Sequence, residues 1–235
     1  MISDVVDSTL SQRFKGKGAT RAGMLAIAGG KGGCGKTTTA LGLAQALAAM
    51  SRRPLVVDTD RDMPNLHHRA GIEPTTGISD IEPTTDPATQ AQWASRVEDV
   101  EILPCLSASA AALGRVVDKL AQRDRPVLLD CPAGSGPDAA LPLRAADRTV
   151  LVSAPDRQSL TDTAKTAAMA HELDAPPVLT VLVGSDGAVD PSALLSCSRT
   201  VHIPSVSTPL DATVTEAKYV AMVNVLIDIL QRVKP

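Results

Sequence analysis

The chain has 235 residues, enough for one α/β domain with a substantial buried core. Its formal net charge of −3 gives no basic excess, so nucleic-acid binding through bulk positive charge is not indicated. Aromatic residues make up only 1% of the chain, which excludes aromatic stacking platforms for bases. No apolar run approaches the roughly 18 to 20 residues of a membrane span, and the four cysteines form no C-x-x-C pair. We therefore expect a protein of the reducing cytoplasm with free thiols.

Residues 1–23 form an N-terminal extension with its own pattern. Apolar residues recur there at spacings of three and four, which predicts a short amphipathic helix: Ile2, Val5, Val6, Leu10 and Phe14. A polar, basic tract follows this segment. The extension could be a helix that docks on a membrane surface or a partner, a helix packed on the body, a frayed end, or the product of a start assigned too early. The last three are favoured, because so short a helix is marginal alone.

From Met24 onward the pattern alternates between strands and helices. Apolar runs of strand length predict strands at 24–28, 54–58, 100–103, 126–130, 149–153, 178–183 and 200–203. Helical spacing predicts helices near 37–50, 107–123, 137–145, 159–173 and 212–233. The polar, turn-rich interval 75–92 is expected to be a surface loop. Residues 24–235 are therefore predicted to be one α/β domain, with a mostly parallel sheet of about seven strands and helices on both faces.

A glycine-rich loop lies between the first predicted strand and the first predicted helix. The spacing Gly30-x4-Gly35-Lys36-Thr37 satisfies the phosphate-binding pattern of P-loop NTPases. Glycines let backbone N–H groups turn toward an anion at the helix N-terminus, and the lysine then reaches the β- and γ-phosphates. The threonine hydroxyl can ligate Mg²⁺. The predicted nucleotide-binding residues are Gly30, Lys31, Gly32, Gly33, Cys34, Gly35, Lys36, Thr37 and Thr38.

Two predicted strands end in aspartate, after Leu55-Val-Val and after Val127-Leu-Leu. Because the carboxyl ends of parallel strands meet at one edge, both acidic clusters should lie beside the glycine-rich loop. Phosphoryl transfer needs a carboxylate to hold the Mg²⁺ water shell and another group to orient the attacking water. Asp130 suits the first role and Asp60 the second, with Asp58 as a supporting residue near the metal.

The segment Lys31-Gly-Gly-Cys-Gly-Lys36-Thr-Thr38 resembles the deviant Walker A motif of the MinD/ParA ATPases. Asp58-Thr-Asp60-Arg-Asp-Met-Pro-Asn65 is similar to the segment after their second strand, and Asp130-Cys-Pro-Ala-Gly134 resembles the Asp-x-Pro-Ala-Gly of the MinD branch. The resemblance implies that Asp60 positions the lytic water and that Asn65 and Gly134 belong to switch segments. It also implies that Lys31 crosses a dimer interface to the partner's phosphates, and that Pro204 lies in a loop lining the adenine.

The resemblance implies a Mg²⁺-dependent ATPase that dimerises on binding ATP and positions a structure in the cell. Hydrolysis is expected to be slow and stimulated by an activating protein, with Lys31, Lys36 and Asp60 as catalytic residues. Three alternatives remain: a ParA-type partition ATPase that binds DNA, a metabolic or transport ATPase, and a nucleotide-binding switch that does not hydrolyse ATP. The low positive charge does not favour DNA. No separate anchor helix follows 212–233, so membrane contact is expected only through a partner or the N-terminal helix.

Smaller signals concern Cys34 and the pair His67-His68. Cys34 could sense oxidation if the helix N-terminus stabilised its thiolate, but a small residue that simply fits is the favoured interpretation. Adjacent histidines cannot both face one metal from a helix, so a surface or interface role is expected for His67 and His68.

Overall fold

The computed structural model describes residues 23–230, so the predicted N-terminal helix lies outside the described residues. An eight-stranded sheet has the order β3-β4-β2-β5-β1-β6-β7-β8. All pairings are parallel except that between β3 and β4. The strands are β1 (Met24–Gly29), β2 (Leu55–Asp58), β3 (Gln92–Trp93), β4 (Glu101–Leu103), β5 (Val127–Ala133), β6 (Arg148–Ser153), β7 (Pro177–Val183) and β8 (Thr200–Ile203). The seven predicted strands are confirmed, and β3 is an addition that the sequence did not indicate.

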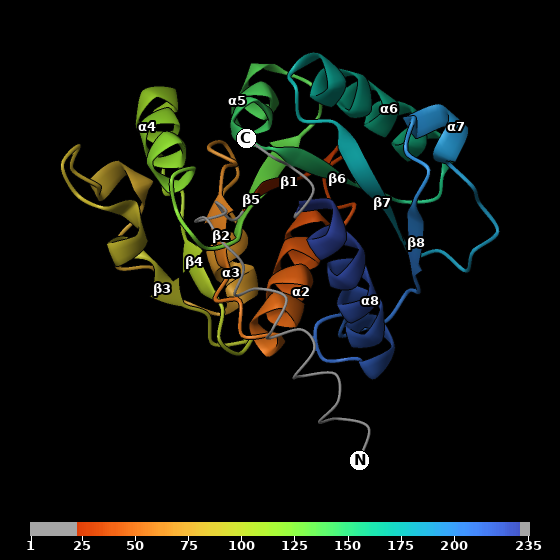
Figure 1. The fold of residues 1–235 in the computed structure, drawn as a ribbon, viewed down its shortest axis with the longest axis horizontal. Coiled ribbons are helices and arrows are strands. Elements are labelled where there is room, and N and C mark those ends of the chain that lie inside the picture. The colour runs from red at the N-terminus through yellow and green to blue at the C-terminus, as the bar shows by residue number, and fades with distance from the viewer. Residues whose placement is uncertain (1–22, 231–235) are drawn as a thin grey trace.

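Helices cover both faces of the sheet, as Figure 1 shows. The five predicted helices are confirmed with shifts of up to three residues at their ends: α2 (Lys36–Ala49), α4 (Ala110–Leu120), α5 (Pro137–Ala145), α6 (Arg157–Glu172) and α8 (Thr213–Leu230). Two short helices were not predicted, α3 (Leu66–Ala70) and α7 (Ser192–Leu195). Within the described residues, no helix has the length and apolar character needed to cross a bilayer.

The core consists of two main apolar layers, one on each face of the sheet. One layer joins α2, α3 and α8 to the sheet, and the other joins α4, α5 and α6 to the opposite face. Central strands such as β1 and β2 are buried along their whole length, which explains their continuous apolar runs. Fully burying one aliphatic side chain contributes about 1.5–3 kcal/mol. The sheet can therefore be stabilised by small aliphatic residues with few aromatics.

The interval 75–92 is more ordered than the sequence suggested. It contains two 3₁₀ helices, Ile78–Asp80 and Pro87–Gln90, and Ile78 is fully buried. Lys119 of α4 donates hydrogen bonds to the backbone carbonyls of Pro83 and Thr85. The interval therefore packs on α4 rather than forming a free surface loop.

Candidate functional site

The glycine-rich loop connects β1 to α2 at the carboxyl edge of the central strand. Gly35 adopts a φ of 100°, a left-handed conformation that glycine reaches without strain. This turn sets Lys36 at the first position of α2, where its Nζ donates to the backbone carbonyl of Lys31 at 3.2 Å. The loop therefore closes around the side chain of Lys36, at the N-terminus of α2, where an anion can bind.

The first part of the loop is packed against α6. A Cβ added at Gly30 would lie 2.1 Å from the carbonyl carbon of Asp162, so only glycine fits there. The Gly30 N–H donates to the Thr163 hydroxyl at 3.4 Å. Past this contact the loop turns outward, and Lys31, Gly32 and Gly33 are exposed. Thr37 and Thr38 are half-buried in the first turn of α2.

Cys34 is buried within this loop. Its Sγ donates to the carbonyl of Val152, and burial raises the pKa of its thiol. A raised pKa keeps the thiol protonated and unreactive near neutral pH. The structure therefore favours the packing interpretation of Cys34 over an oxidation sensor.

Two carboxylates lie on the neighbouring strands β2 and β5: Asp58 ends β2, whereas Asp130 lies three residues before the end of β5. Asp58 and Asp130 are 1% and 4% exposed, and they are partners in the strand register. Burial, followed by the charge of Asp130, raises the pKa of Asp58 to about 8. Burial also raises the pKa of Asp130 to about 7, opposed by the nearby Thr37 hydroxyl and the charge of Lys36. The pair therefore tends to hold protons at neutral pH, and a nearby cation would favour its ionised form.

The two buried carboxylates differ in what they contact. Asp58 accepts backbone N–H groups from Asp60 and Leu66, at 3.0 and 3.2 Å. It thereby fixes both ends of the loop 60–65 and the start of α3. By contrast, the Oδ1 atom of Asp130 is buried without a hydrogen-bond partner. Asp58 thus shapes the loop, while Asp130 keeps an oxygen for another ligand.

The loop 60–65 brings Asp60 and Asn65 to the edge of the site. Asp60 is half-buried and accepts the backbone N–H of Met63 at 3.0 Å. The Thr37 hydroxyl donates to the Asn65 side-chain oxygen at 3.0 Å, which connects this loop to the first turn of α2. The residues assigned to the first switch segment and to the metal are therefore in direct contact.

Gly134 lies where β5 leaves the sheet. Its N–H donates to the carbonyl of Gly29 at 3.2 Å, and its carbonyl accepts the Thr166 hydroxyl of α6 at 3.2 Å. Pro204 follows β8, in a loop whose neighbour Ile203 accepts N–H groups from Gly184 and Ser185. The side chain of Val183, at the end of β7, lies against Gly35. The end of β7 therefore adjoins the glycine-rich loop, and the end of β8 adjoins the loop after β7.

One contact at this edge was missed by the sequence reasoning. Arg61, directly after Asp60, forms an ion pair with Asp138 in the first turn of α5. Hydrogen bonding to Asp138 raises the pKa of the Arg61 guanidinium. No spacing rule connects two residues so far apart in sequence. Arg61 directly follows Asp60, and Asp138 lies four residues after Gly134, so nearness to these two motifs was the available signal.

The surface or interface position expected for the two histidines is found for His68 but not for His67. His67 is buried, its ring lies against that of exposed His68, and burial lowers its pKa. The cause is the short helix α3, which turns His67 inward. In the described part of the chain, no group of three or more His, Cys, Asp or Glu residues is arranged to hold a metal ion. A metal here would need oxygen ligands from fewer carboxylates.

The donors that do meet at this edge suit Mg²⁺. This ion takes one or two carboxylates and keeps several waters, and it prefers hydroxyl and carboxylate oxygens. Asp130 presents a buried oxygen without a hydrogen-bond partner, close to the Thr37 hydroxyl and to Lys36. A helix N-terminus, a lysine, a hydroxyl and a buried carboxylate together can hold a metal-bound polyphosphate.

Comparison with known proteins gives three findings. The family model of the CobQ/CobB/MinD/ParA nucleotide binding domain matches residues 25–192. An uncharacterized ATP-binding protein of Methanocaldococcus jannaschii is 31% identical over 158 residues, covering 63% of this chain and 59% of that protein. The septum site-determining protein MinD of Bacillus subtilis is 31% identical over 149 residues, covering 59% of this chain and 55% of that protein. The matched segment thus spans less than two thirds of the length of either relative.

A solved structure shows the same fold. The septum site-determining protein MinD from Pyrococcus horikoshii, complexed with Mg-ADP, superposes with a TM-score of 0.72. The match covers 90% of this chain and 100% of that one, at 24% identity. The α/β architecture predicted from the sequence is therefore confirmed.

Proposed function

Because the chain belongs to the CobQ/CobB/MinD/ParA nucleotide-binding family, we propose that it is a Mg²⁺-dependent ATPase working as an ATP-switched dimer. We propose further that the dimer positions a cellular structure and that an activating protein stimulates its slow hydrolysis. One observation carries the proposal: Lys36, Asp58 and Asp130 are buried within one chain, whereas Lys31 of the same loop as Lys36 is exposed. An exposed cation on this loop is accessible to a second copy of the chain.

The choice of ATP and Mg²⁺ rests on the relatives and on the donor set. The Methanocaldococcus relative is described as ATP-binding, and the Pyrococcus structure contains Mg-ADP. Thr37 and Asp130 would hold the metal, with Asp58 shaping the loop beside them. A magnesium ion held there would supply positive charge beside the phosphates. Pro204 is assigned to the loop beside the base on the family resemblance of Ile203-Pro204, and this loop follows β8, the neighbour of β7 in the sheet.

The remaining roles fall to residues of the chain itself. Lys36 and the loop amides bind the phosphates, and Asp60 orients the attacking water. Its loop is fixed by Asp58 and joined to the metal residue through the contact between Asn65 and Thr37. Lys31 reaches the phosphates of a second copy, where a cation stabilises the transition state. Such a site is complete only in the dimer, which accounts for slow turnover in a single chain.

The experiment that tests this proposal is the light-scattering mass of the Asp60→Ala variant in ADP and in ATP. The substitution should prevent turnover, so that an ATP-bound state accumulates. We expect a monomer in ADP and a doubled mass in ATP with Mg²⁺. The matched control is Asp62→Ala, at an exposed neighbouring carboxylate. A mass that does not change between nucleotides would remove the role given to Lys31 and leave a nucleotide-binding domain without a dimer switch.

A further inference from the structure

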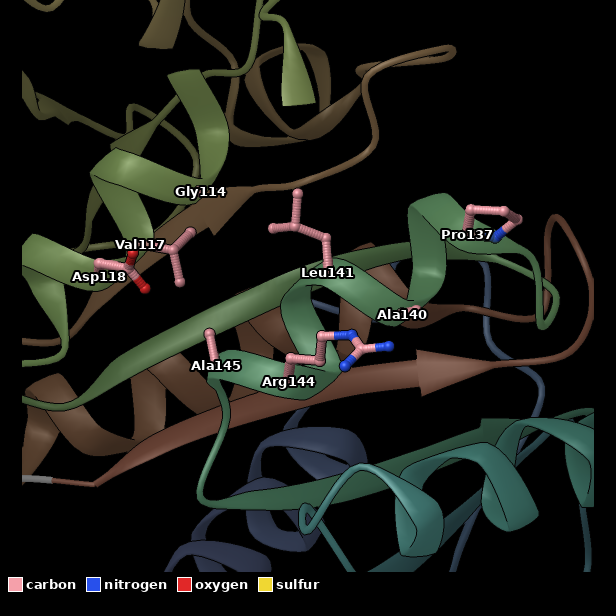
Figure 2. Close-up of a pocket in the computed structure, with 8 residues that line it drawn as sticks. All are labelled: Gly114, Val117, Asp118, Pro137, Ala140, Leu141, Arg144 and Ala145. Carbon is pink, nitrogen blue, oxygen red and sulfur yellow. The ribbon is translucent and has the colours of Figure 1, made fainter. Parts of the chain in front are cut away.

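A groove runs between α4 and α5 on the face of the sheet that these helices cover. Its first part has a volume of about 450 Å³ and lies between Val117 and Leu141 (Figure 2). Its second part, of about 510 Å³, continues past the ends of both helices to Asp147 and Arg148. The two parts share Asp118, Arg144 and Ala145, so they form one continuous depression, here called the α4–α5 groove.

The first part of the groove is apolar at its floor and charged at its rim. Gly114 opens it, because a Cβ added there would meet no atom within 4 Å. Leu141 is half-buried, and Figure 2 shows its side chain extending from α5 into the space between the helices. Asp118 and Arg144 lie at the rim, where charged side chains remain in water. This surface fits an occupant with one apolar and one polar face.

The far end of the groove lies where the N-terminal extension enters the fold. The Met24 N–H donates to the Asp147 carboxylate at 2.7 Å, and the Asp147 N–H donates to the Met24 carbonyl at 2.8 Å. Asp147 also lines the second part of the groove. Residues 1–22, which lie outside the described part, therefore connect to the chain directly beside this depression.

The extension has the length and pattern to fill the groove. A helix over residues 2–14 would be about 20 Å long, and α5 itself is about 14 Å long. The connection from 15 to 22 can span up to about 27 Å. The apolar stripe at helical spacing ends in the chain's single phenylalanine: Ile2, Val5, Val6, Leu10 and Phe14.

We propose that residues 2–14 bind in the α4–α5 groove as an amphipathic helix, with their apolar stripe against the half-buried side chains of Leu141 and Ala140. The occupant is a segment of the chain itself, since its attachment point and reach match the groove. At its other end the groove reaches Pro137, directly before Asp138. Asp138 is the ion-pair partner of Arg61, so the bound segment lies against the helix that holds the Asp60 loop. Docking itself does not depend on the proposed ATPase activity.

The first test uses disulfide trapping in the full-length chain carrying Leu10→Cys and Leu141→Cys. The four native cysteines are buried, so the introduced thiols should react first. Mild oxidation followed by peptide mass mapping should show an intramolecular disulfide between positions 10 and 141. The matched control pairs Leu10→Cys with Leu194→Cys, at a residue that is 52% exposed on α7. We expect at least fivefold faster trapping in the groove pair; equal rates, or disulfides only between chains, would overturn the proposal.

The second test fills the groove. Gly114→Leu directs a side chain into open space, whereas Gly114→Ala adds only a methyl group, and both should favour the helix. Hydrogen exchange of residues 2–14 should be slowed at least tenfold in the wild-type chain and in Gly114→Ala, and should be unprotected in Gly114→Leu. Protection unchanged in Gly114→Leu would contradict the proposed site. Unprotected amides in the wild-type chain would overturn the proposal and leave the groove to a separate partner.

Discussion

The inner and outer parts of the candidate site are built differently. The inner part consists of Asp58 and Asp130, which lie on neighbouring strands and are each less than 5% exposed. The carboxylate oxygens of Asp58 are fixed by backbone N–H groups. The outer part consists of Lys31, which is exposed, and Asp60, which is half-buried; each lies on a loop at the rim of the site. Buried groups of fixed geometry suit ligands that one chain must hold alone. Exposed charges on the same edge suit a surface that meets something else. We therefore propose that the inner part serves binding of the metal and nucleotide, and that the outer part serves hydrolysis.

The sharpest way to break this comparison is Lys31→Ala. A cation supplied in trans contributes about 10³- to 10⁵-fold to turnover, so phosphate release should fall by that range. Affinity for ATP should change little, because the inner residues remain intact. Lys165→Ala provides the control, at an exposed lysine of α6 that forms an ion pair with Asp162. Full activity of the Lys31 variant would mean that one chain holds a complete site.

Asp60→Ala should reduce turnover by about 10²- to 10⁴-fold, the range for a positioned acid–base group. ATP should still bind, since the substitution leaves Lys36 and the buried carboxylates in place. Single-turnover hydrolysis and nucleotide titration separate these two effects. Asp62→Ala should behave as the wild type. Unimpaired hydrolysis in the Asp60 variant would exclude it as the residue that orients water.

Lys36→Ala should act on binding rather than on turnover alone. A hydrogen bond to a charged group contributes about 1.5–3 kcal/mol, which corresponds to about 10- to 150-fold in affinity. Titration with a fluorescent ATP analogue measures the loss. A melting curve checks that α2 is intact, because Lys36 also holds the carbonyl of Lys31. If the folded variant binds ATP as tightly as the wild type, the phosphate-loop assignment is wrong.

The inner carboxylates should make stability depend on pH in an unusual direction. Their pKa values in the folded chain, about 8 for Asp58 and about 7 for Asp130, exceed the ordinary value of 3.8. Between about pH 4 and 8 the folded state therefore binds more protons than the unfolded state, so this pair's contribution to stability falls as pH rises. Asp130→Asn removes one of these two titrating groups. The free energy of unfolding of the variant minus that of the wild type should therefore be more positive at pH 8 than at pH 5, in denaturant titrations without Mg²⁺. A difference between variant and wild type that is the same at both pH values would contradict the raised pKa of Asp130.

Local and continuous patterns made most of the fold predictable. The run Val127-Leu-Leu-Asp130 is buried from both sides. The glycine-rich loop is recognisable from a motif of nine consecutive residues, 30–38. Features that depend on distant contacts were not predictable. The strand β3 has only two residues, and α3 begins where Asp58 accepts the Leu66 N–H. The burial of His67 follows from that helix. The ion pair of Arg61 with Asp138 exists only after β2 and β5 have paired.

The glycines of the phosphate loop differ in how much space surrounds them. Gly30 is closed against the backbone of α6, while a Cβ at Gly32 would meet nothing within 4 Å. Substitution by a larger residue should therefore be excluded at position 30 and sterically permitted at position 32. Gly33 is also open, but its φ of 76° favours glycine. The exposed Lys31 therefore follows a position at which the backbone of α6 leaves room for glycine alone.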